Sequence, residues 1–160
     1  MDLLLSNKVA IVTGASRGIG KAIVETLSSE GMRVVLVARS RVELESLAKS
    51  LPNESLVQAI DLREPDSANQ VLDATIEKFG KVDLLVNNAG ATKRGDFFQL
   101  TDEEWADGFA LKFFGAMRLS RAAWTPLQAS KGTIINIIGV GGKAGSAEFI
   151  IGGAARSVPC

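Results

Sequence analysis

The sequence of 160 residues predicts a doubly wound parallel sheet with helices on both faces, and three observations support this fold class. Short runs of Val, Ile and Leu alternate along the chain with amphipathic stretches of helical length. The apolar runs are continuous, which is typical of strands that are buried on both faces. The glycine-rich segment TGASRGIG directly follows the first run. Alternating strands and helices favour right-handed crossovers within one parallel sheet, and therefore one domain over residues 1–160.

Five strands are expected, and each is indicated by a short run of aliphatic and β-branched residues. All five are expected to be fully buried. Ligands of such sheets bind beyond the carboxyl ends of the strands, so the loops that follow the strands are the expected functional positions. The expected strands are residues 9–12, 34–37, 56–60, 82–86 and 133–138.

Four helices are expected between the strands, because apolar residues recur there with the period of an α-helix. Pro65 suits a first helical turn, where no backbone N–H is needed. Thr101 and Glu104 have the spacing of a capping box, which marks the start of the last and longest helix. The expected helices are residues 18–30, 41–50, 65–79 and 102–124.

The composition restricts the partners and the compartment of the protein. Eighteen basic residues balance eighteen acidic ones, so binding to nucleic acid or to an anionic membrane is not expected. The single cysteine, Cys160, permits no internal disulfide and no CxxC metal site, which favours a reducing compartment. No basic leader and no 18-residue apolar run occurs in the sequence. We therefore expect a soluble cytoplasmic protein that holds no metal.

The chain contains no histidine and no tyrosine. Both residue types commonly transfer protons near neutral pH. Any general acid or base must therefore be a lysine, a carboxylate or a hydroxyl group.

The segment TGASRGIG has the spacing of a dinucleotide-binding loop between a strand and a helix. Gly14 permits a tight turn, Gly18 lets the backbone approach a pyrophosphate, and Gly20 permits close packing of the helix. The amino end of the helix offers free N–H groups to the phosphates. A plain turn is the alternative. The predicted cofactor contacts of this loop are Gly14, Ser16, Arg17, Gly18, Ile19 and Gly20.

The second loop indicates which dinucleotide is preferred. A carboxylate near the end of this strand would bind the ribose 2′-hydroxyl of NAD, but Ala38 and Arg39 stand there instead. Arg39, together with Arg17 and Ser40, can receive a 2′-phosphate, because a guanidinium group matches phosphate oxygens. NADP is therefore expected and NAD is disfavoured. Alternatively, Arg39 and Arg41 are only the solvated start of a helix.

The third loop begins with Asp61 and Leu62. We expect Asp61 to accept a hydrogen bond from the adenine amino group and Leu62 to lie beside it. A lone aspartate can equally cap a turn.

After the fourth strand comes NNAG, residues 87–90. Together with TGASRGIG, the basic residue after the second strand, the DL pair, Trp105 and the helix FFGAMRLSRAAW, it resembles the short-chain dehydrogenase/reductase family over essentially the whole chain. The resemblance implies a Rossmann-type fold, an NAD(P) cofactor and hydride transfer between a carbonyl and an alcohol. It also implies that NNAG steadies the sheet and that Asn88, Ala89 and Gly90 lie beside the cofactor.

The family's reaction uses Ser, Tyr, Lys and Asn, and this sequence departs from the pattern at all four positions. In the order Ser, Tyr, Lys and Asn, the resemblance assigns them to Gly139, Gly152, Arg156 and Lys112. Residues of a catalytic unit act together, so losing several leaves only a small remnant of activity. The chain is therefore expected to be a catalytically impaired NADP-dependent oxidoreductase.

Two other functions stay open. Lys112 is the principal candidate for a substitute proton donor or an anion-binding group, and Lys143, Ser146 and Glu148 are weaker candidates. In that case the chain is an active reductase that uses Lys112 or Glu148. The other possibility is a non-catalytic module that senses the nucleotide or binds a protein partner. An ordinary helix lysine and a surface loop are the alternatives for these residues.

The resemblance also implies that the carboxyl-terminal part of the fold is missing after Cys160. The segment GGAARSVPC contains Pro159 and no helical stripe, so no proper helix is expected there. The fifth strand would then leave an open sheet edge, and homo-oligomerisation through the family's usual interface would be incomplete. The substrate is expected to be a small carbonyl compound of unspecified identity. Four aromatic residues either line its pocket or belong to the core: Phe97, Phe98, Phe113 and Phe114.

Overall fold

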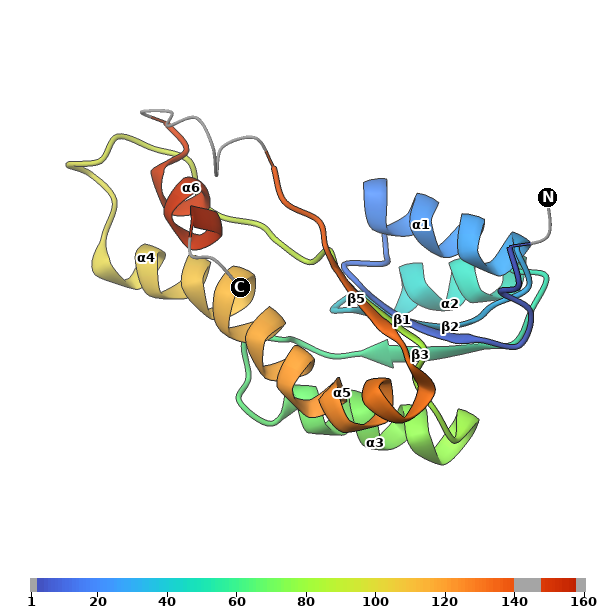
Figure 1. Ribbon diagram of the computed structural model, residues 1–160. Helices are drawn as coiled ribbons and strands as arrows, with labels where there is room; N and C mark the ends of the chain where they lie inside the picture. Colours follow the sequence, from blue (N-terminus) through green and yellow to red (C-terminus); the bar gives the residue numbers. More distant parts are fainter. Residues whose placement is uncertain (1–2, 140–147, 158–160) are drawn as a thin grey trace.

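The computed structural model describes residues 3–139 and 148–157. Five parallel strands form one sheet with the order β3-β2-β1-β4-β5, which confirms the doubly wound fold (Figure 1). The order in which the strands are added changes direction at β1: the chain first adds β2 and β3 on one side and then returns to add β4 and β5 on the other, as in Rossmann-type folds. The strands are β1 (Val9–Thr13), β2 (Arg33–Ala38), β3 (Ser55–Ala59), β4 (Leu84–Asn87) and β5 (Thr133–Asn136).

Helices cover both faces of the sheet (Figure 1). Helices α1 and α2 lie on one face, α3 and α5 lie on the other, and α4 extends beyond the sheet together with α6. The helices are α1 (Gly18–Ser29), α2 (Arg41–Ser50), α3 (Ser67–Phe79), α4 (Asp102–Phe109), the π-helix η1 (Ala110–Gly115), α5 (Ala116–Ser130) and α6 (Ile150–Ser157). No helix among the described residues is both long and apolar enough to cross a membrane.

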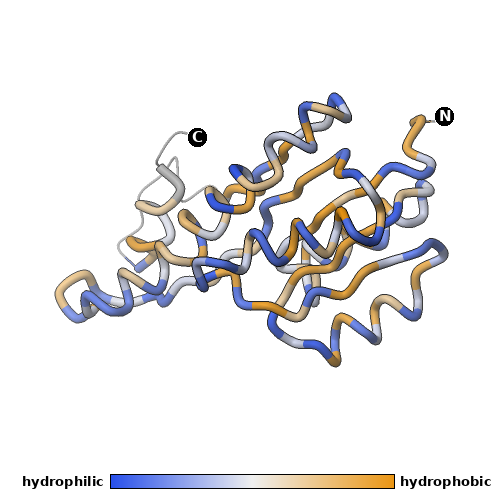
Figure 2. The backbone as a smooth tube through the Cα atoms, turned by 90° about the horizontal axis from the view of Figure 1, so that it is seen from below, coloured by the Kyte–Doolittle hydropathy of each residue, from blue (hydrophilic) through white to orange (hydrophobic). Residues whose placement is uncertain are grey.

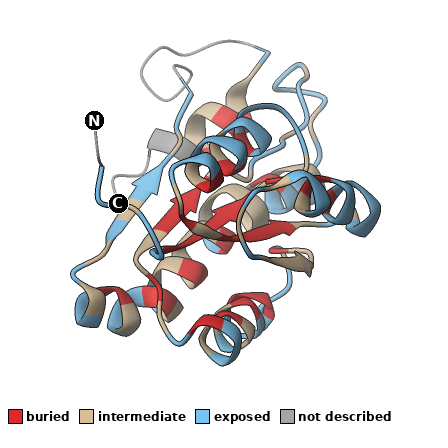
Figure 3. Ribbon diagram, turned by 90° about the vertical axis from the view of Figure 1, so that its right-hand side faces the viewer, coloured by how far each residue is buried: buried red, intermediate tan, exposed pale blue. Residues whose placement is uncertain are grey.

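The core consists of two layers, one on each face of the sheet. Ile11 packs with Leu85 and Leu119 in the layer towards α3 and α5. Val12 packs with Val24 in the layer towards α1. Successive side chains of a strand point to opposite faces of the sheet, so Ile11 enters one layer and Val12 the other. Both residues are apolar because helices cover both faces of the sheet. The strands are orange along most of their length in Figure 2, and the centre of the sheet is buried in Figure 3.

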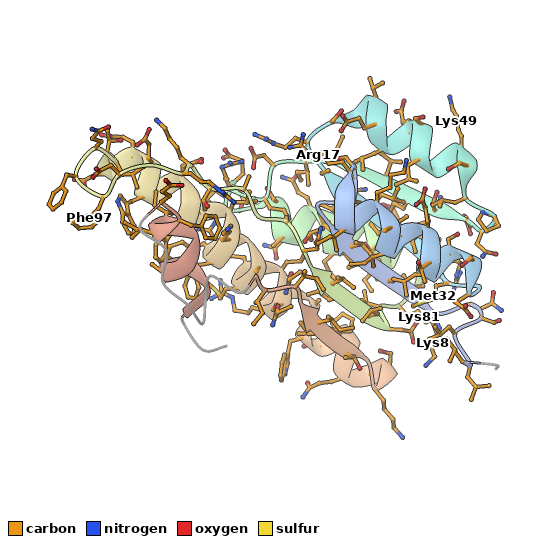
Figure 4. All side chains as sticks on the ribbon, turned by 90° about the horizontal axis from the view of Figure 1, so that it is seen from above. Lys8, Arg17, Met32, Lys49, Lys81 and Phe97 are labelled. Atoms are coloured by element: carbon orange, nitrogen blue, oxygen red, sulfur yellow. The ribbon has the colours of Figure 1, made fainter. Side chains whose placement is uncertain are left out.

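The register of the sheet brings the carboxyl ends of four strands together. Ile11 of β1 is paired with Val35 of β2 and with Leu85 of β4. In Figure 4, Lys8 and Lys81 lie together at the amino ends of their strands, and Arg17 lies at the opposite end of the sheet. The loops that carry the predicted contacts therefore meet at one edge.

The predicted helix over residues 102–124 is in fact three consecutive elements, α4, η1 and α5, which together continue to Ser130. It starts with the predicted capping box, in which the Thr101 hydroxyl accepts a hydrogen bond from the backbone N–H of Glu104 and the Glu104 carboxylate accepts one from the backbone N–H of Thr101. The Glu104 pKa is lowered by its hydrogen bonds to Lys93 and to that backbone N–H. After α4, the π-helix η1 interrupts the α-helical hydrogen bonds before α5 continues. A π-helix has no strong sequence signature, which is why the periodicity missed it.

One further boundary prediction and one burial prediction are wrong in detail. Helix α3 begins at Ser67 with Asp66 as its N-cap, so Pro65 lies in the preceding turn. The prediction of full burial fails for β3, which is half-buried, and for β5, whose residue Ile135 is 43% exposed. Both strands form edges of the sheet, and most of β5 is pale blue in Figure 3.

The expectation that no helix forms near the end of the described chain is also wrong. Helix α6 packs on α4 and η1. Ile151 is fully buried in this contact, and a Cβ atom on Gly108 would overlap the Ile151 side chain. The close approach at Gly108 therefore buries the apolar side of α6, which outweighs the low helix propensity of its glycines. Pro159 and Cys160 lie outside the described residues.

We expect Leu85→Ala to lower the free energy of unfolding by about 2–5 kcal/mol, because Leu85 is fully buried between the sheet and two helices. Denaturant titration followed by circular dichroism measures the change. Val42→Ala is the control, since Val42 is exposed on α2 and its truncation should change stability by less than about 0.5 kcal/mol. Equal losses in the two variants would contradict the assigned core.

Candidate functional site

A cleft of about 850 Å³ opens at the carboxyl ends of the strands. Its walls come from the loops after β1, β2, β3 and β4, from η1 and from the segment after β5. Apart from Gly18, every predicted cofactor contact lines this cleft. These residues are Gly14, Ser16, Arg17, Ile19, Gly20, Arg39, Ser40, Asp61, Leu62, Asn88, Ala89 and Gly90.

The turn between β1 and α1 has the shape of a cradle made of backbone. Gly14 and Gly18 have positive φ angles of 66° and 56°, which L-residues with side chains rarely adopt. A Cβ atom on Gly20 would overlap the carbonyl oxygen of Gly14. No side chain caps the first turn of α1. Backbone N–H groups at a helix start, with no side chain in the way, fit the pyrophosphate of a dinucleotide.

The hydroxyl group of Thr13 joins this turn to the loop after β4. Its Oγ1 atom accepts hydrogen bonds from the backbone N–H groups of Asn88 and Ala89, both at 2.9 Å, and donates one to the carbonyl of Val86 at 3.2 Å. In return, Nδ2 of Asn88 donates to the carbonyl of Thr13 at 2.9 Å. These bonds fix the two loops against each other on the floor of the cleft.

Asn87 holds together the elements behind the cleft. Its Nδ2 atom donates to Oδ1 of Asn136 at 2.9 Å and to Oγ of Ser120 at 3.0 Å. Asn87 ends β4, Asn136 ends β5 and Ser120 belongs to α5. The amide therefore ties two strands to the helix that covers them.

Positive charge borders the cleft beside β2. Arg17 and Arg39 both line it, and both have exposed side chains. Glu43, in the first turn of α2, lines the same region. The sequence prediction omitted Glu43, although its place one turn after Arg39 could have indicated it. A carboxylate near the two guanidinium groups reduces their net attraction for a phosphate.

Asp61 caps a turn, which is the role that the sequence left open as the alternative to binding adenine. Its Oδ1 atom accepts from the backbone N–H of Arg63 at 3.0 Å and pairs with the Arg63 guanidinium at 3.3 Å. Nε of Arg63 also contacts Oδ1 of Asp107 at 2.5 Å, which links the β3 loop to α4. Burial lowers the pKa of Arg63, but hydrogen bonds and charges from Asp107 and Asp61 outweigh this and raise it above its usual value. Asp61 still lines the cleft.

The far end of the cleft contains Lys112 and Phe149. Lys112 lies in η1, and its Nζ atom is 4.6 Å from the centre of the Phe149 ring. Gly139 lines the cleft nearby, and a Cβ atom there would meet nothing within 4 Å. A Cβ atom on Gly152, by contrast, would overlap the Phe149 ring. The ring therefore occupies the space in front of Gly152.

Of the weaker candidates, the structure describes only Glu148. Glu148 is exposed and is not among the residues that line the cleft. Lys143 and Ser146 lie outside the described residues, and so does the side chain of Arg156. None of the four phenylalanines that might have formed a substrate pocket lines the cleft: Phe97, Phe98, Phe113 and Phe114. Phe98 is 91% exposed, so it does not belong to the core either.

Sequence reasoning missed Arg63 and the apolar wall of the cleft. Arg63 lines the cleft and could have been found, because it directly follows the predicted Asp61 and Leu62. Phe149 could not, because its place depends on how α6 packs against η1. The apolar lining residues that were missed are Val37, Ile60, Ala91, Leu111, Ile137, Ile138 and Phe149.

A parallel sheet with this strand order and a glycine turn after its first strand define a Rossmann-type protein. The sequence pattern of the short chain dehydrogenases matches residues 8–157. The chain belongs to the short-chain dehydrogenase family.

Individual relatives agree with this family. The chain is 38% identical to the 3-oxoacyl-(acyl-carrier-protein) reductase FabG of Vibrio cholerae, over 91% of this chain and 61% of that protein. It is 35% identical to the FabG of Escherichia coli, over 89% of this chain and 60% of that protein. The chain thus spans about three fifths of the length of these relatives.

Solved structures of the family have the same fold. L-sorbose reductase from Gluconobacter frateurii, complexed with NADPH and L-sorbose, matches with a TM-score of 0.92 and 32% identity, over 98% of this chain and 62% of that one. NAD⁺-bound xylitol dehydrogenase matches with a TM-score of 0.90 and 25% identity, over 96% of this chain and 61% of that one. Family members with this fold thus occur with either dinucleotide.

We expect Thr13→Val to lower the free energy of unfolding by about 1–3 kcal/mol, because two partly buried N–H groups lose their acceptor. The same change should weaken dinucleotide binding, since Asn88 and Ala89 line the cleft. Thermal unfolding and NADPH titration measure the two effects. Thr13→Ser keeps the hydroxyl group and should keep most of both properties. The hydrogen-bond assignment is wrong if the Val variant behaves like the Ser variant.

Proposed function

We propose that the chain binds NADP(H) in the cleft at the carboxyl ends of the strands and is a catalytically impaired oxidoreductase of its family. The nominal reaction is hydride transfer between the nicotinamide and a carbonyl or alcohol substrate. The overlap between the Phe149 ring and any side chain at Gly152 is the observation that most strongly supports the impairment.

The residues of the cleft suit each part of a dinucleotide. The turn at Gly14 and Gly20 would hold the pyrophosphate against the start of α1. Asp61 would face the adenine, with Oδ1 already engaged by Arg63. Asn88 would lie beside the nicotinamide half. When bound, the cofactor supplies the hydride, and the protein supplies position and protons.

The preference for NADP rests on charge at the ribose end. Ala38 stands where a carboxylate would select NAD, and the guanidinium groups of Arg17 and Arg39 border the cleft there. The relative complexed with NADPH supports this preference, whereas the NAD⁺-bound relative shows that family membership does not decide it. Glu43 opposes it to some degree.

The proton-transfer step is the part for which no side chain is suited. Gly139 and Gly152 stand at the serine and tyrosine positions, so neither provides a hydroxyl group. The resemblance puts Arg156 at the lysine position and Lys112 at the asparagine position. An arginine stays protonated near neutral pH, so it does not exchange protons as a lysine with a lowered pKa does.

The alternatives differ in what supports them. An active reductase would use Lys112 rather than Glu148, because only Lys112 lines the cleft among these two. A non-catalytic module is supported by the exposed edge strand β5. Turnover separates the first alternative from the proposal, and co-purification of a partner separates the second.

Arg39→Asp should weaken NADPH binding by at least about tenfold and reverse the order of affinity of NADPH and NADH, because a carboxylate repels the 2′-phosphate and accepts from a 2′-hydroxyl. Fluorescence titration with both nucleotides measures this ratio. Arg41→Asp is the matched control, since Arg41 pairs with Glu45 on α2 and does not line the cleft. Equal affinity of the unchanged protein for the two nucleotides would remove the role of Arg39.

We expect the purified protein to oxidise NADPH only slowly in the presence of a panel of ketones. Its kcat should be at least about a thousandfold below the median enzyme value of roughly 10 s⁻¹. Restoring the family residues as G139S/G152Y/R156K should recover little activity, because the Phe149 ring overlaps the position of a Cβ atom at residue 152. Adding Phe149→Ala to this triple variant should raise the rate. Rapid turnover by the unchanged chain would refute the proposed impairment.

A further inference from the structure

The side chain of Arg63 connects the loop after β3 to helix α4. Its Nε and Nη2 atoms donate to Oδ1 and Oδ2 of Asp107, at 2.5 and 3.2 Å. Its Nη1 atom donates to Oδ1 and Oδ2 of Asp61, at 3.3 and 3.4 Å. The Arg63 side chain is 19% exposed, although Asp107 on the surface of α4 is 55% exposed. One guanidinium group therefore holds two carboxylates from distant segments of the chain.

The backbone that carries Asp61 and Arg63 is also held in place. The hydroxyl group of Ser67, the first residue of α3, donates to the carbonyl of Asp61. Nη1 of Arg118, in α5, donates to the carbonyl of Arg63 at 3.3 Å. With the Asp107 contact, the turn is attached to α3, α4 and α5. The Asp61 side chain therefore projects from a backbone of fixed geometry.

The contacts of Asp61 engage its two oxygens unequally. Oδ1 accepts from the backbone N–H of Arg63 at 3.0 Å and from Nη1 at 3.3 Å, whereas Oδ2 has the longer contact of 3.4 Å with Nη1. An ionised carboxylate has about four acceptor positions and no hydrogen to donate. Since Asp61 and Arg63 both line the cleft, this carboxylate suits a ligand that offers an N–H group and disfavours one that offers a carbonyl oxygen.

We propose that Arg63, anchored by Asp107, is a positioning residue that fixes the Asp61 carboxylate for recognition of the exocyclic amino group of adenine. This inference rests on the proposed function, in which Asp61 faces the adenine of a bound dinucleotide. A guanidinium group bound by both oxygens of one carboxylate has a defined orientation, and Arg63 passes this orientation on to Asp61. Arg63 acts through Asp61, so a residue of α4 outside the cleft contributes to selection of the base.

The deaminated form of NADPH, which contains hypoxanthine, tests this selection. It has a carbonyl oxygen in place of the exocyclic amino group and keeps the sugars, the phosphates and the nicotinamide. Fluorescence titration of the unchanged protein should give at least about tenfold weaker binding of the deaminated nucleotide, because a hydrogen bond to a charged group is lost. The measured quantity is the ratio of the two dissociation constants.

Variants at both ends of the Arg63 contact should change this ratio. Arg63→Gln and Asp107→Asn should each lower it by about threefold or more, by weakening NADPH and leaving the deaminated nucleotide within about twofold. Arg63→Lys should lower it less than Arg63→Gln, because it keeps the charge but lacks the planar fork. Asp102→Asn is the matched control and should leave the ratio unchanged, since Asp102 lies in the first turn of the same helix and does not line the cleft.

The ratio distinguishes positioning from two simpler roles of Arg63. Disturbed packing, or a direct contact of Arg63 with a phosphate group, would weaken both nucleotides equally. Equal weakening by Arg63→Gln and Asp107→Asn would therefore overturn the inference.

A double variant tests whether the effect passes through Asp61. In Asp61→Ala the ratio should approach one, and adding Asp107→Asn should then change it by less than about 1.5-fold. A larger change in the Asp61→Ala background would contradict the proposed route.

The titration of the unchanged protein separates this inference from the function on which it rests. Failure to bind either nucleotide would overturn the proposed function and this inference with it. Equal affinity for NADPH and its deaminated form would overturn only the selection of adenine by Asp61 and Arg63.

Discussion

The contact between the first turn and the loop after β4 constrains the whole site. The buried hydroxyl group of Thr13 accepts from two consecutive backbone N–H groups, and Asn88 donates back to the turn. This exchange is possible only because β1 and β4 are parallel neighbours whose ends lie level. The glycines of the turn thereby leave room for the Asn88 side chain of the NNAG loop, and the cleft forms beside that junction.

The other end of the cleft is organised by packing of helices. Helix α6 approaches α4 closely because Gly108 leaves room for Ile151, and the glycine at 152 leaves room for the Phe149 ring. Lys112 reaches this ring from a π-helix, which turns its side chain towards the cleft.

The two ends of the cleft are built of different groups. The end at the glycine turn consists mostly of backbone, with Gly14 and Gly18 at positive φ angles. The opposite end contains the side chains of Lys112 and Phe149. Under the proposed function, binding and turnover rest on different atoms, so one can be kept while the other is lost.

Most of the fold, and the glycine turn that lines one end of the cleft, could be predicted from local patterns. The five strands, the helix boundaries of α2 and the capping box at Thr101 depend on neighbouring residues, and the glycine turn needs only its own spacing. The half-buried edge strands, the π-helix around Lys112 and the placement of Phe149 depend on contacts between segments far apart in the chain. Helix α6 forms against its own glycine-rich sequence because burial of Ile151 on α4 compensates for weak propensity. Local sequence determines local geometry, whereas the end of the cleft that contains Lys112 and Phe149 is determined by which distant surfaces pack together.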